Sequence, residues 1–432
     1  MAELDGVVLD EDSFVDLLGR LIGEAKYLQN NPPELTPCED RAARHVLDAL
    51  SPYSDENGGP LKIRHITFVE GRGNIIGEAD GGIMSFVGAH MDVVTANPET
   101  WNFSPFELTR DGDQLRGRGT TDCLGHVAVL TELFKVLGQK KPKLKRTVVG
   151  VWIANEENSK ILGVGVDELV KQGYLKHLLP GPLYWVDTAD SQPCIGTGGS
   201  MGWQLTANGK LFHSGLPNKS VNPIELAMEA LSEIQSRFYR DFPPHPDELK
   251  YKFATPSTMK PTQVSYPGGS INQIPGQVTI CGDCRLTPFY EVEDAMEKLK
   301  TYVDDINANI TALPTRGPCS KYELPEEGLR GTLELKFFDA YTRGVACKLD
   351  SVGYHAMFEA FKEVYGDCKP FSITGSLPCI RELQDEGYDV QTIGFGKMST
   401  YHANNEYCLL SDFKKGFNVL VKLVQVFNAK DA

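Results

Sequence analysis

Several carboxylates and histidines in this sequence directly follow stretches that are predicted to be buried strands. The central example is Val148–Ile153, a run of mostly β-branched and aromatic residues that leads through Ala154 and Asn155 to Glu156 and Glu157. Side chains of neighbouring residues at a strand end point in different directions, so the two glutamates are expected to have separate tasks. An isolated Glu-Glu pair is more often a solvated acidic loop. The other strand ends therefore decide the interpretation.

Those strand ends carry the same kind of residue. The strand 83–88 precedes His90 and Asp92, the strand 183–186 precedes Asp187, and the last predicted strand precedes His402. Asp122 follows a glycine-rich segment and directly precedes a helix. In an open α/β sheet such groups meet beyond the carboxyl ends of the strands.

So many carboxylates at one edge would repel one another, and bound divalent cations would relieve that repulsion. Two histidines with three carboxylates are too many ligands for one four-coordinate zinc ion. They suit a pair of ions that share a carboxylate, which lie about 3.5–4 Å apart in such sites. Asp92 lies two residues after His90 in an extended segment, so it could hold the free ring nitrogen of His90.

The order of predicted elements indicates an α/β fold with a second domain inserted into the first. Up to residue 186, strands and helices alternate as in a mainly parallel sheet. Residues 201–338 then read strand, helix, strand, strand, helix, strand, which is a ferredoxin-like βαββαβ unit. The predicted division is 1–197 and 341–432 for a catalytic dinuclear-metal domain, with 198–340 as an inserted lid and dimerisation domain. Two local predictions are a helix that begins at Thr36-Pro37 with Glu39 in a capping box, and a helix over 161–172.

Composition narrows the class of protein and its compartment. The 432 residues carry a net charge of −15, which disfavours nucleic acid as a partner. No apolar run is long enough for a membrane span, and the N-terminus lacks the pattern of a signal or transit peptide. Ten cysteines are too dilute for a disulfide framework, and the Cys281/Cys284 pair lies in an alternating strand and is interpreted as structural. A cytoplasmic location is expected, with a plastid route left open.

These motifs together resemble the dinuclear-zinc aminoacylase and carboxypeptidase family over nearly the whole chain. The resemblance is carried by the following segments: Gly88–Asp92, Gly117–Asp122, Glu156-Glu157, His213-Ser214-Gly215, Asn272, Asp283-x-Arg285 and His402. Segments 31–37 and 216–223 make the chain most similar to plant-type members of the acetylornithine deacetylase and succinyl-diaminopimelate desuccinylase branch. Where that branch usually has Glu as a ligand, this chain has Asp187.

The resemblance implies a role for each matching residue. It places His90 and Asp187 on one zinc or cobalt ion and Glu157 and His402 on the other, with Asp122 bridging. It implies that Glu156 is the general base and that Asp92 orients His90. His213, Asn272 and Arg285 would contact substrate, with His213 reaching into the neighbouring site of a homodimer.

The expected activity is hydrolysis of a linear amide by metal-activated water, with a small N-acyl amino acid as substrate. N-acetyl-L-ornithine is the expected substrate, which would give L-ornithine for arginine biosynthesis. The alternatives are a related deacylase, a dipeptidase or carboxypeptidase, and a non-catalytic member that only binds metal or an acylated amino acid. A serine hydrolase is not expected, because no Gly-x-Ser-x-Gly turn is predicted to join a strand to a helix.

Simpler roles remain open for three kinds of residue. Arg285 could be only a sheet-surface partner of Asp283, and His213 could cap the turn that follows it. His126, His177 and His355 are interpreted as ordinary helix residues without partners.

Overall fold

A computed structural model describes residues 2–79, 83–158, 160–319 and 321–429. The chain divides into two compact units, residues 1–195, 347–371 and 378–432 forming the first and residues 196–346 and 372–377 the second. Each unit has its own hydrophobic core. The catalytic role predicted for the first part of the chain, and the lid and dimerisation role predicted for the second, stay predictions.

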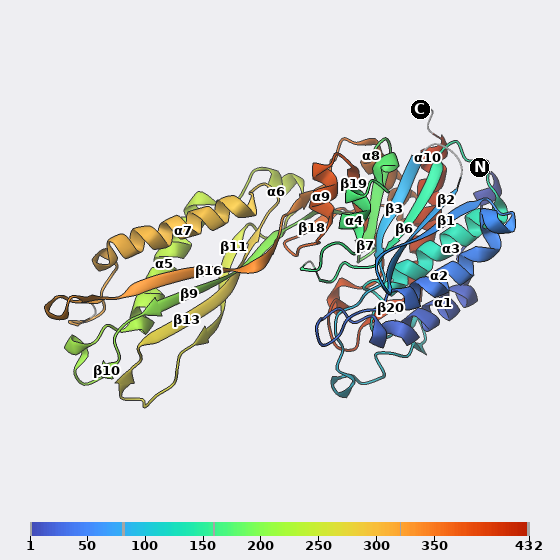
Figure 1. Cartoon of the computed structure of the whole chain (residues 1–432). Helices are drawn as coiled ribbons and strands as arrows, with labels where there is room; N and C mark the ends of the chain where they lie inside the picture. Colours follow the sequence, from blue (N-terminus) through green and yellow to red (C-terminus); the bar gives the residue numbers. More distant parts are fainter. Residues whose placement is uncertain (1, 80–82, 159, 320, 430–432) are drawn as a thin grey trace. The chain divides into compact units, whose positions relative to one another are not determined.

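The first unit is an α/β structure built on a mixed sheet (Figure 1). Six of its strands follow the order β1-β2-β6-β3-β7-β19. They are β1 (Leu61–Val69), β2 (Arg72–Ala79), β3 (Ile83–His90), β6 (Thr147–Ile153), β7 (Pro182–Thr188) and β19 (Asp389–Gly394). The four strands β6, β3, β7 and β19 run parallel to one another, whereas β2 is antiparallel to both of its neighbours, β1 and β6. The α/β class is confirmed.

Helices cover this sheet with their apolar faces. They are α1 (Glu11–Glu24), α2 (Asp40–Leu50), α3 (Leu124–Lys140), α4 (Val166–Lys171), α8 (Val352–Tyr365), α9 (Ile380–Asp385) and α10 (Leu410–Ala429). Helix α3 packs on the sheet through Phe134, whose ring centroid lies 5.4 Å from that of Trp152 on β6. Among the residues described, no helix is both long and apolar enough to cross a lipid bilayer.

Two local helix predictions are wrong. Helix α2 begins at Asp40, and Glu39 makes no side-chain cap. The reason is that the carboxylate of Glu39 is fully buried against Arg72, with contacts of 2.5–3.1 Å, and so cannot reach back to Thr36. The helix predicted over 161–172 is confined to α4, because Asn155 binds the carbonyl of Ile161 and draws the preceding residues into a loop.

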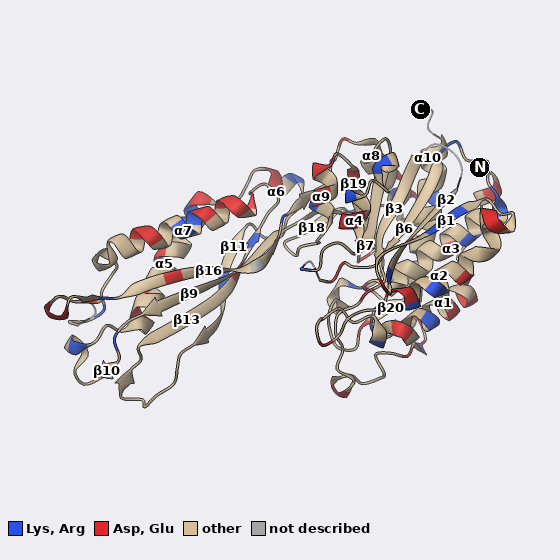
Figure 2. Cartoon of the chain, viewed as in Figure 1, with Lys and Arg blue, Asp and Glu red and all other residues tan. Residues whose placement is uncertain are grey.

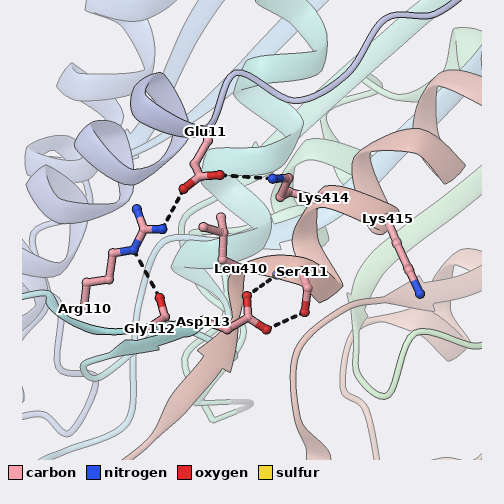
Figure 3. Close-up of a pocket in the computed structure, with 8 residues that line it drawn as sticks. All are labelled: Glu11, Arg110, Gly112, Asp113, Leu410, Ser411, Lys414 and Lys415. Atoms are coloured by element: carbon pink, nitrogen blue, oxygen red, sulfur yellow. Dashed lines mark hydrogen bonds and ion pairs between the residues drawn. The ribbon is translucent and has the colours of Figure 1, made fainter.

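The first residues of α10 line a surface pocket that Figure 3 shows in close-up, and contacts within this pocket hold them in place. Asp113 accepts hydrogen bonds from the backbone N–H and the hydroxyl of Ser411, at 2.9 and 2.6 Å. Glu11 in the same pocket pairs with Arg110 and Lys414. These contacts lie beside β5 (Gln114–Arg116), which pairs with β20 (Tyr407–Leu409). The first residues of α10 are thereby held next to Asp113, the residue just before β5.

The second unit has a four-stranded antiparallel sheet of order β11-β13-β9-β16. Its main elements are β9 (Gly199–Asn208), α5 (Pro223–Asp241), β11 (Thr258–Ser265), β13 (Gln277–Leu286), α7 (Val292–Ala308) and β16 (Thr332–Thr342). Figure 2 shows Lys and Arg interspersed with Asp and Glu along the helices of the chain.

Strand β3 contains one glycine that its bulge requires. The pairing of β3 with β6 shifts register between Val87 and Ala89, and the intervening Gly88 has φ +96°. A Cβ at this position would lie 2.5 Å from the ring of Trp185. Gly88 therefore lets β3 bulge just before His90.

We expect Gly88→Ala to lower the free energy of unfolding by about 2–4 kcal/mol, because left-handed strain and overpacking add. The matched control is Gly366→Ala at the end of α8, where φ is +79° and nothing lies within 4 Å of the new Cβ. There only the strain of about 1–2 kcal/mol applies. Denaturant unfolding of both variants measures the difference, and equal losses would contradict the packing argument.

Candidate metal centre

Three adjacent parallel strands bring the predicted ligands of the first unit to one edge of the sheet. His90 ends β3 and is paired in register with Ile153, the last residue of β6. Glu156 and Glu157 lie three and four residues after Ile153. Asp187 lies near the end of β7, which is the other neighbour of β3.

His90 is surrounded by carboxylates. Its Nε2 lies 3.1 Å from Oδ1 of Asp122, 3.4 Å from Oδ1 of Asp187 and 3.9 Å from Oε2 of Glu156. The side chain of His90 is fully buried, and that of Glu156 is nearly so. These four side chains form the first cluster.

His402 forms a second cluster with two carboxylates. Its Nε2 lies 3.1 Å from Oδ2 of Asp122 and 3.1 Å from Oε2 of Glu157. Asp122 thus turns one oxygen to each histidine, which is the arrangement expected of a carboxylate shared by two ions. The side chain of His402 is 57% exposed, so this cluster is open to solvent within the first unit.

The protonation of the clusters follows from this crowding. Burial, followed by repulsion from Asp187, raises the pKa of Glu156 well above its usual value, and burial raises that of Glu157 to about 8. Burial also raises the pKa of Asp187. Burial opposes ionisation of Asp122 too, but its hydrogen bonds to His402 and His90 prevail and lower its pKa.

The histidines respond in the opposite sense. Hydrogen bonds to Asp122 and Glu157 raise the pKa of His402 to about 11. Burial works against a charged His90, but Asp187 and its other acidic neighbours raise its pKa well above the usual value. The clusters therefore demand positive charge, which protons on the histidines supply when no cation does.

The donor set suits divalent cations. His90, Asp122 and Glu157 offer donor atoms that all lie within 4.8 Å of one another, and so do His90, Cys123 and Asp187. Oε1 of Glu157 is buried without a hydrogen-bond partner in the described structure. Imidazole and carboxylate groups are the ligands that zinc prefers together with thiolate. Ion binding would release the protons that the histidines hold.

Asp92 contacts His90, but it has a second task as well. His90 Nδ1 lies 2.9 Å from the carbonyl oxygen of Asp92 and 3.2 Å from its Oδ1. The same carboxylate accepts hydrogen bonds from the backbone N–H groups of Glu156 and Glu157 at 3.1–3.2 Å. Asp92 thus links the histidine of β3 to the glutamates after β6.

Asn30 contacts the carboxylate of Asp92, and no sequence pattern points to it. Its amide donates to Asp92 at 2.7 Å and to the side-chain oxygen of Asn155 at 2.8 Å. Arg72, held by Glu39, donates to the same oxygen of Asn155 at 3.3 Å. A buried chain of hydrogen bonds therefore runs from Glu39 to the backbone of the glutamate pair.

The predicted substrate residues lie in the second unit and have local partners there. Gly215 N–H donates to Nδ1 of His213 at 2.9 Å, and Arg285 donates to Asp283 at 2.7 Å. Both contacts are those that the simpler interpretations expect. The carbonyl of Asn272 accepts from Ser214 N–H at 2.9 Å, so Asn272 and His213 lie on neighbouring segments. Their roles toward substrate stay predictions.

The prediction that three histidines have no partners is wrong. His126 is buried, stacks on Phe395 and accepts a hydrogen bond from its N–H at 2.8 Å, while burial lowers the pKa of His126 to about 3. His177 lies 3.1 Å from Glu78, and the ring of His355 contacts that of Tyr354. Sequence periodicity places a histidine on a helix but cannot show what a distant segment brings to it.

Two buried charged residues near Asp122 have no role predicted from the sequence. Glu406 and Arg118 form an ion pair at 2.7 Å, and both side chains are almost fully buried. A signal exists in the sequence, since Arg118 interrupts the glycine-rich segment and Glu406 follows His402 by four residues. The position of Cys123 beside His90 and Asp187 has no such signal.

An α/β unit whose parallel strands end in two histidine–carboxylate clusters sharing one carboxylate has the architecture of a metal-dependent hydrolase. Comparison with known proteins agrees. Residues 86–426 match the model of "Peptidase family M20/M25/M40". The chain belongs to this family and is a hydrolase.

The chain is similar to two curated relatives along almost its whole length. It is 64% identical over 421 residues to an acetylornithine deacetylase from Arabidopsis thaliana, covering 96% of each chain. It is 51% identical over 434 residues to an acetylornithine deacetylase from Dictyostelium discoideum, covering 97% of each chain.

Solved structures share the fold at low sequence identity. A di-peptidase from Saccharomyces cerevisiae matches with a TM-score of 0.68 at 17% identity, covering 100% of this chain and 98% of the other. A dinuclear metal binding peptidase of the M20 family from Bacillus subtilis matches with a TM-score of 0.61 at 15% identity, covering 98% and 100%.

We expect Asn30→Asp to lower the free energy of unfolding by about 1–3 kcal/mol or more, because a carboxylate would then face Asp92 in a buried site. Asn102→Asp is the control, since the side chain of Asn102 is exposed and makes no hydrogen bond in the described structure, so its replacement should stay within about 0.5 kcal/mol. Chemical denaturation gives both values. Similar values for the two variants would refute the role of Asn30.

Proposed function

We propose that this chain hydrolyses N-acetyl-L-ornithine to L-ornithine and acetate, as a step in arginine biosynthesis. The observation that carries the proposal is the 64% identity to the Arabidopsis thaliana acetylornithine deacetylase over 96% of both chains. The clustered histidines and carboxylates support it, because deacylation of a small N-acyl amino acid needs a metal-activated water and a proton acceptor.

In this proposal, two divalent ions, zinc with cobalt as a substitute, are held by the two clusters. His90 and Asp187 would hold one ion, Glu157 and His402 would hold the other, and Asp122 would be shared by both. When bound, the ions lower the pKa of a shared water and polarise the amide carbonyl.

The residues of the chain then manage one proton and the substrate. Glu156 takes a proton from the attacking water and passes it to the departing amine as the carbon–nitrogen bond breaks. Its burial and raised pKa suit a group that must hold that proton between the two steps. Asp92 keeps His90 and the backbone of Glu156 in place through the contacts described above.

The second unit supplies the substrate contacts in the same proposal. His213 stabilises the oxyanion, and Arg285 with Asn272 binds the α-carboxylate of the substrate. We further propose a homodimer formed through residues 198–340, with His213 reaching into the neighbouring site, and a cytoplasmic location. The net charge of −15 agrees with a small cationic substrate rather than nucleic acid.

The substrate assignment is tested with purified protein loaded with zinc or cobalt and a panel of N-acyl amino acids and dipeptides. We expect release of acetate from N-acetyl-L-ornithine at the highest kcat/KM of the panel. Preferred cleavage of a dipeptide would replace the proposal by a dipeptidase. Tight binding of metal with no turnover of any substrate would indicate a non-catalytic member.

The general base is tested by Glu156→Gln. We expect kcat to fall by about 10²–10⁴-fold, because the proton acceptor is lost, while the metal content stays at the wild-type level. Glu168→Gln is the control, since Glu168 is a nearly buried glutamate of the same unit that pairs with Lys171 and Gln172. A steady-state assay with metal analysis of the same samples decides, and unchanged turnover of Glu156→Gln would refute its role.

A further inference from the structure

Two distant segments of the first unit meet where the two clusters share Asp122. Strand β5 pairs with β20, with Arg116 opposite Tyr407, so residues 117–122 run beside residues 402–406. Asp122 and His402 stand at the far ends of these segments and lie 3.1 Å apart. Whatever fixes the two segments to each other also fixes the distance between these two side chains.

The carboxylate of Glu406 binds the backbone of the Asp122 segment at three points. Oε2 accepts from the N–H of Gly119 at 3.0 Å. Oε1 accepts from the N–H groups of Thr121 and of Asp122 itself, at 2.8 and 3.1 Å. The main chain of Glu406 adds a fourth contact, because its carbonyl accepts from Gly117 N–H at 3.1 Å.

Arg118 completes the arrangement from the opposite segment. One guanidinium nitrogen donates to Glu406 at 2.7 Å. A second one lies 3.3 Å from the carbonyl of Ala403, the residue after His402, and 3.4 Å from that of Thr95. The guanidinium carbon also lies 5.0 Å from the ring centroid of Trp101. Each residue of the pair therefore binds the segment that carries the other.

We propose that Glu406 and Arg118 form a clamp that holds Asp122 and His402 at the separation two divalent ions require, and that this clamp sets the affinity for both ions. The inference depends on the proposed metal centre. Both residues are positioning residues, since their charged groups bind the backbone of the two segments and not the side chains of the clusters.

A buried ion pair that served stability alone would not need these particular contacts. Replacing such a pair with apolar residues is often neutral or stabilising, because the charges must be desolvated. Here the carboxylate binds the N–H of the bridging residue and the guanidinium binds the carbonyl beside the second histidine. Partners that orient metal ligands in this way typically change metal affinity by 10–100-fold when they are lost.

The experiment measures zinc(II) binding to the full chain by competition with a chromophoric chelator, together with thermal unfolding of the metal-free protein. We expect Glu406→Gln to weaken zinc binding by about 10–100-fold, because the amide N–H₂ of the glutamine would face backbone N–H groups that need an acceptor. Both ions should be affected, because Asp122 contacts both histidines. We also expect excess zinc to restore kcat in Glu406→Gln, whereas it would not restore Glu156→Gln.

The control is Glu132→Gln on α3. Glu132 is a buried carboxylate of the same unit that contacts Lys135 and Ser13, at 2.8 and 2.9 Å, and no predicted ligand. Its loss should lower the unfolding temperature without changing zinc affinity. If Glu406→Gln also kept wild-type affinity and only unfolded more easily, the clamp would be refuted.

A second variant covers the case in which Glu406→Gln does not fold. Arg118→Lys keeps the charge but loses the planar fork that reaches two carbonyls and Glu406 together. We expect its zinc affinity to fall several-fold, and an unchanged affinity would overturn the clamp. A wild-type protein that bound no zinc would instead refute the metal centre, so the two failures are distinguishable.

Discussion

The structure depends on how much negative charge can be gathered at one buried edge of a sheet. Four carboxylates approach two histidines there, and burial with mutual repulsion raises the pKa of three of them. Charges at such separations interact strongly where water is largely excluded. The edge is therefore stable only with positive charge inside it, and this requirement explains why its histidines gain protons so readily. A site with this demand is selective for cations before any ligand geometry is considered.

Two buried networks hold the edge from different sides. Asn30, Asn155 and Arg72 support Asp92 and through it the glutamate backbone, whereas Glu406 and Arg118 support the segment of Asp122. Each network buries charged groups, which costs free energy unless every lone pair and proton is used. In the described structure, one polar atom in each network is buried without a hydrogen-bond partner, namely Oδ1 of Asn30 and Nε of Arg118. We therefore infer that the networks serve to fix the positions of Asp92, Asp122 and the glutamate backbone rather than to stabilise the fold.

The sequence indicated the candidate ligands themselves, but it did not indicate the buried residues that hold those ligands in place. Ligands follow strands, and strand ends are visible from β-branched runs and from the polarity that a parallel sheet imposes. The supporting residues are remote in sequence, since Asn30 lies 62 positions from Asp92 and Glu406 lies 284 positions from Asp122. The same remoteness explains the wrong start of α2, because Arg72 takes the carboxylate that local rules assign to a capping box. The prediction that His126 has no partner was wrong for the same reason, because its partner Phe395 is remote in sequence.

The residues predicted to bind substrate pose a different energetic problem. Arg285 is paired with Asp283, and both side chains are more than one-third exposed. An exposed pair of this kind contributes about 0–1 kcal/mol, so a substrate carboxylate could share or replace Asp283 at little cost. A bidentate contact with the guanidinium would exceed that cost, because it makes two charge-assisted hydrogen bonds. The observed pairing is thus compatible with a substrate role, because Asp283 contacts the guanidinium without competing strongly for it.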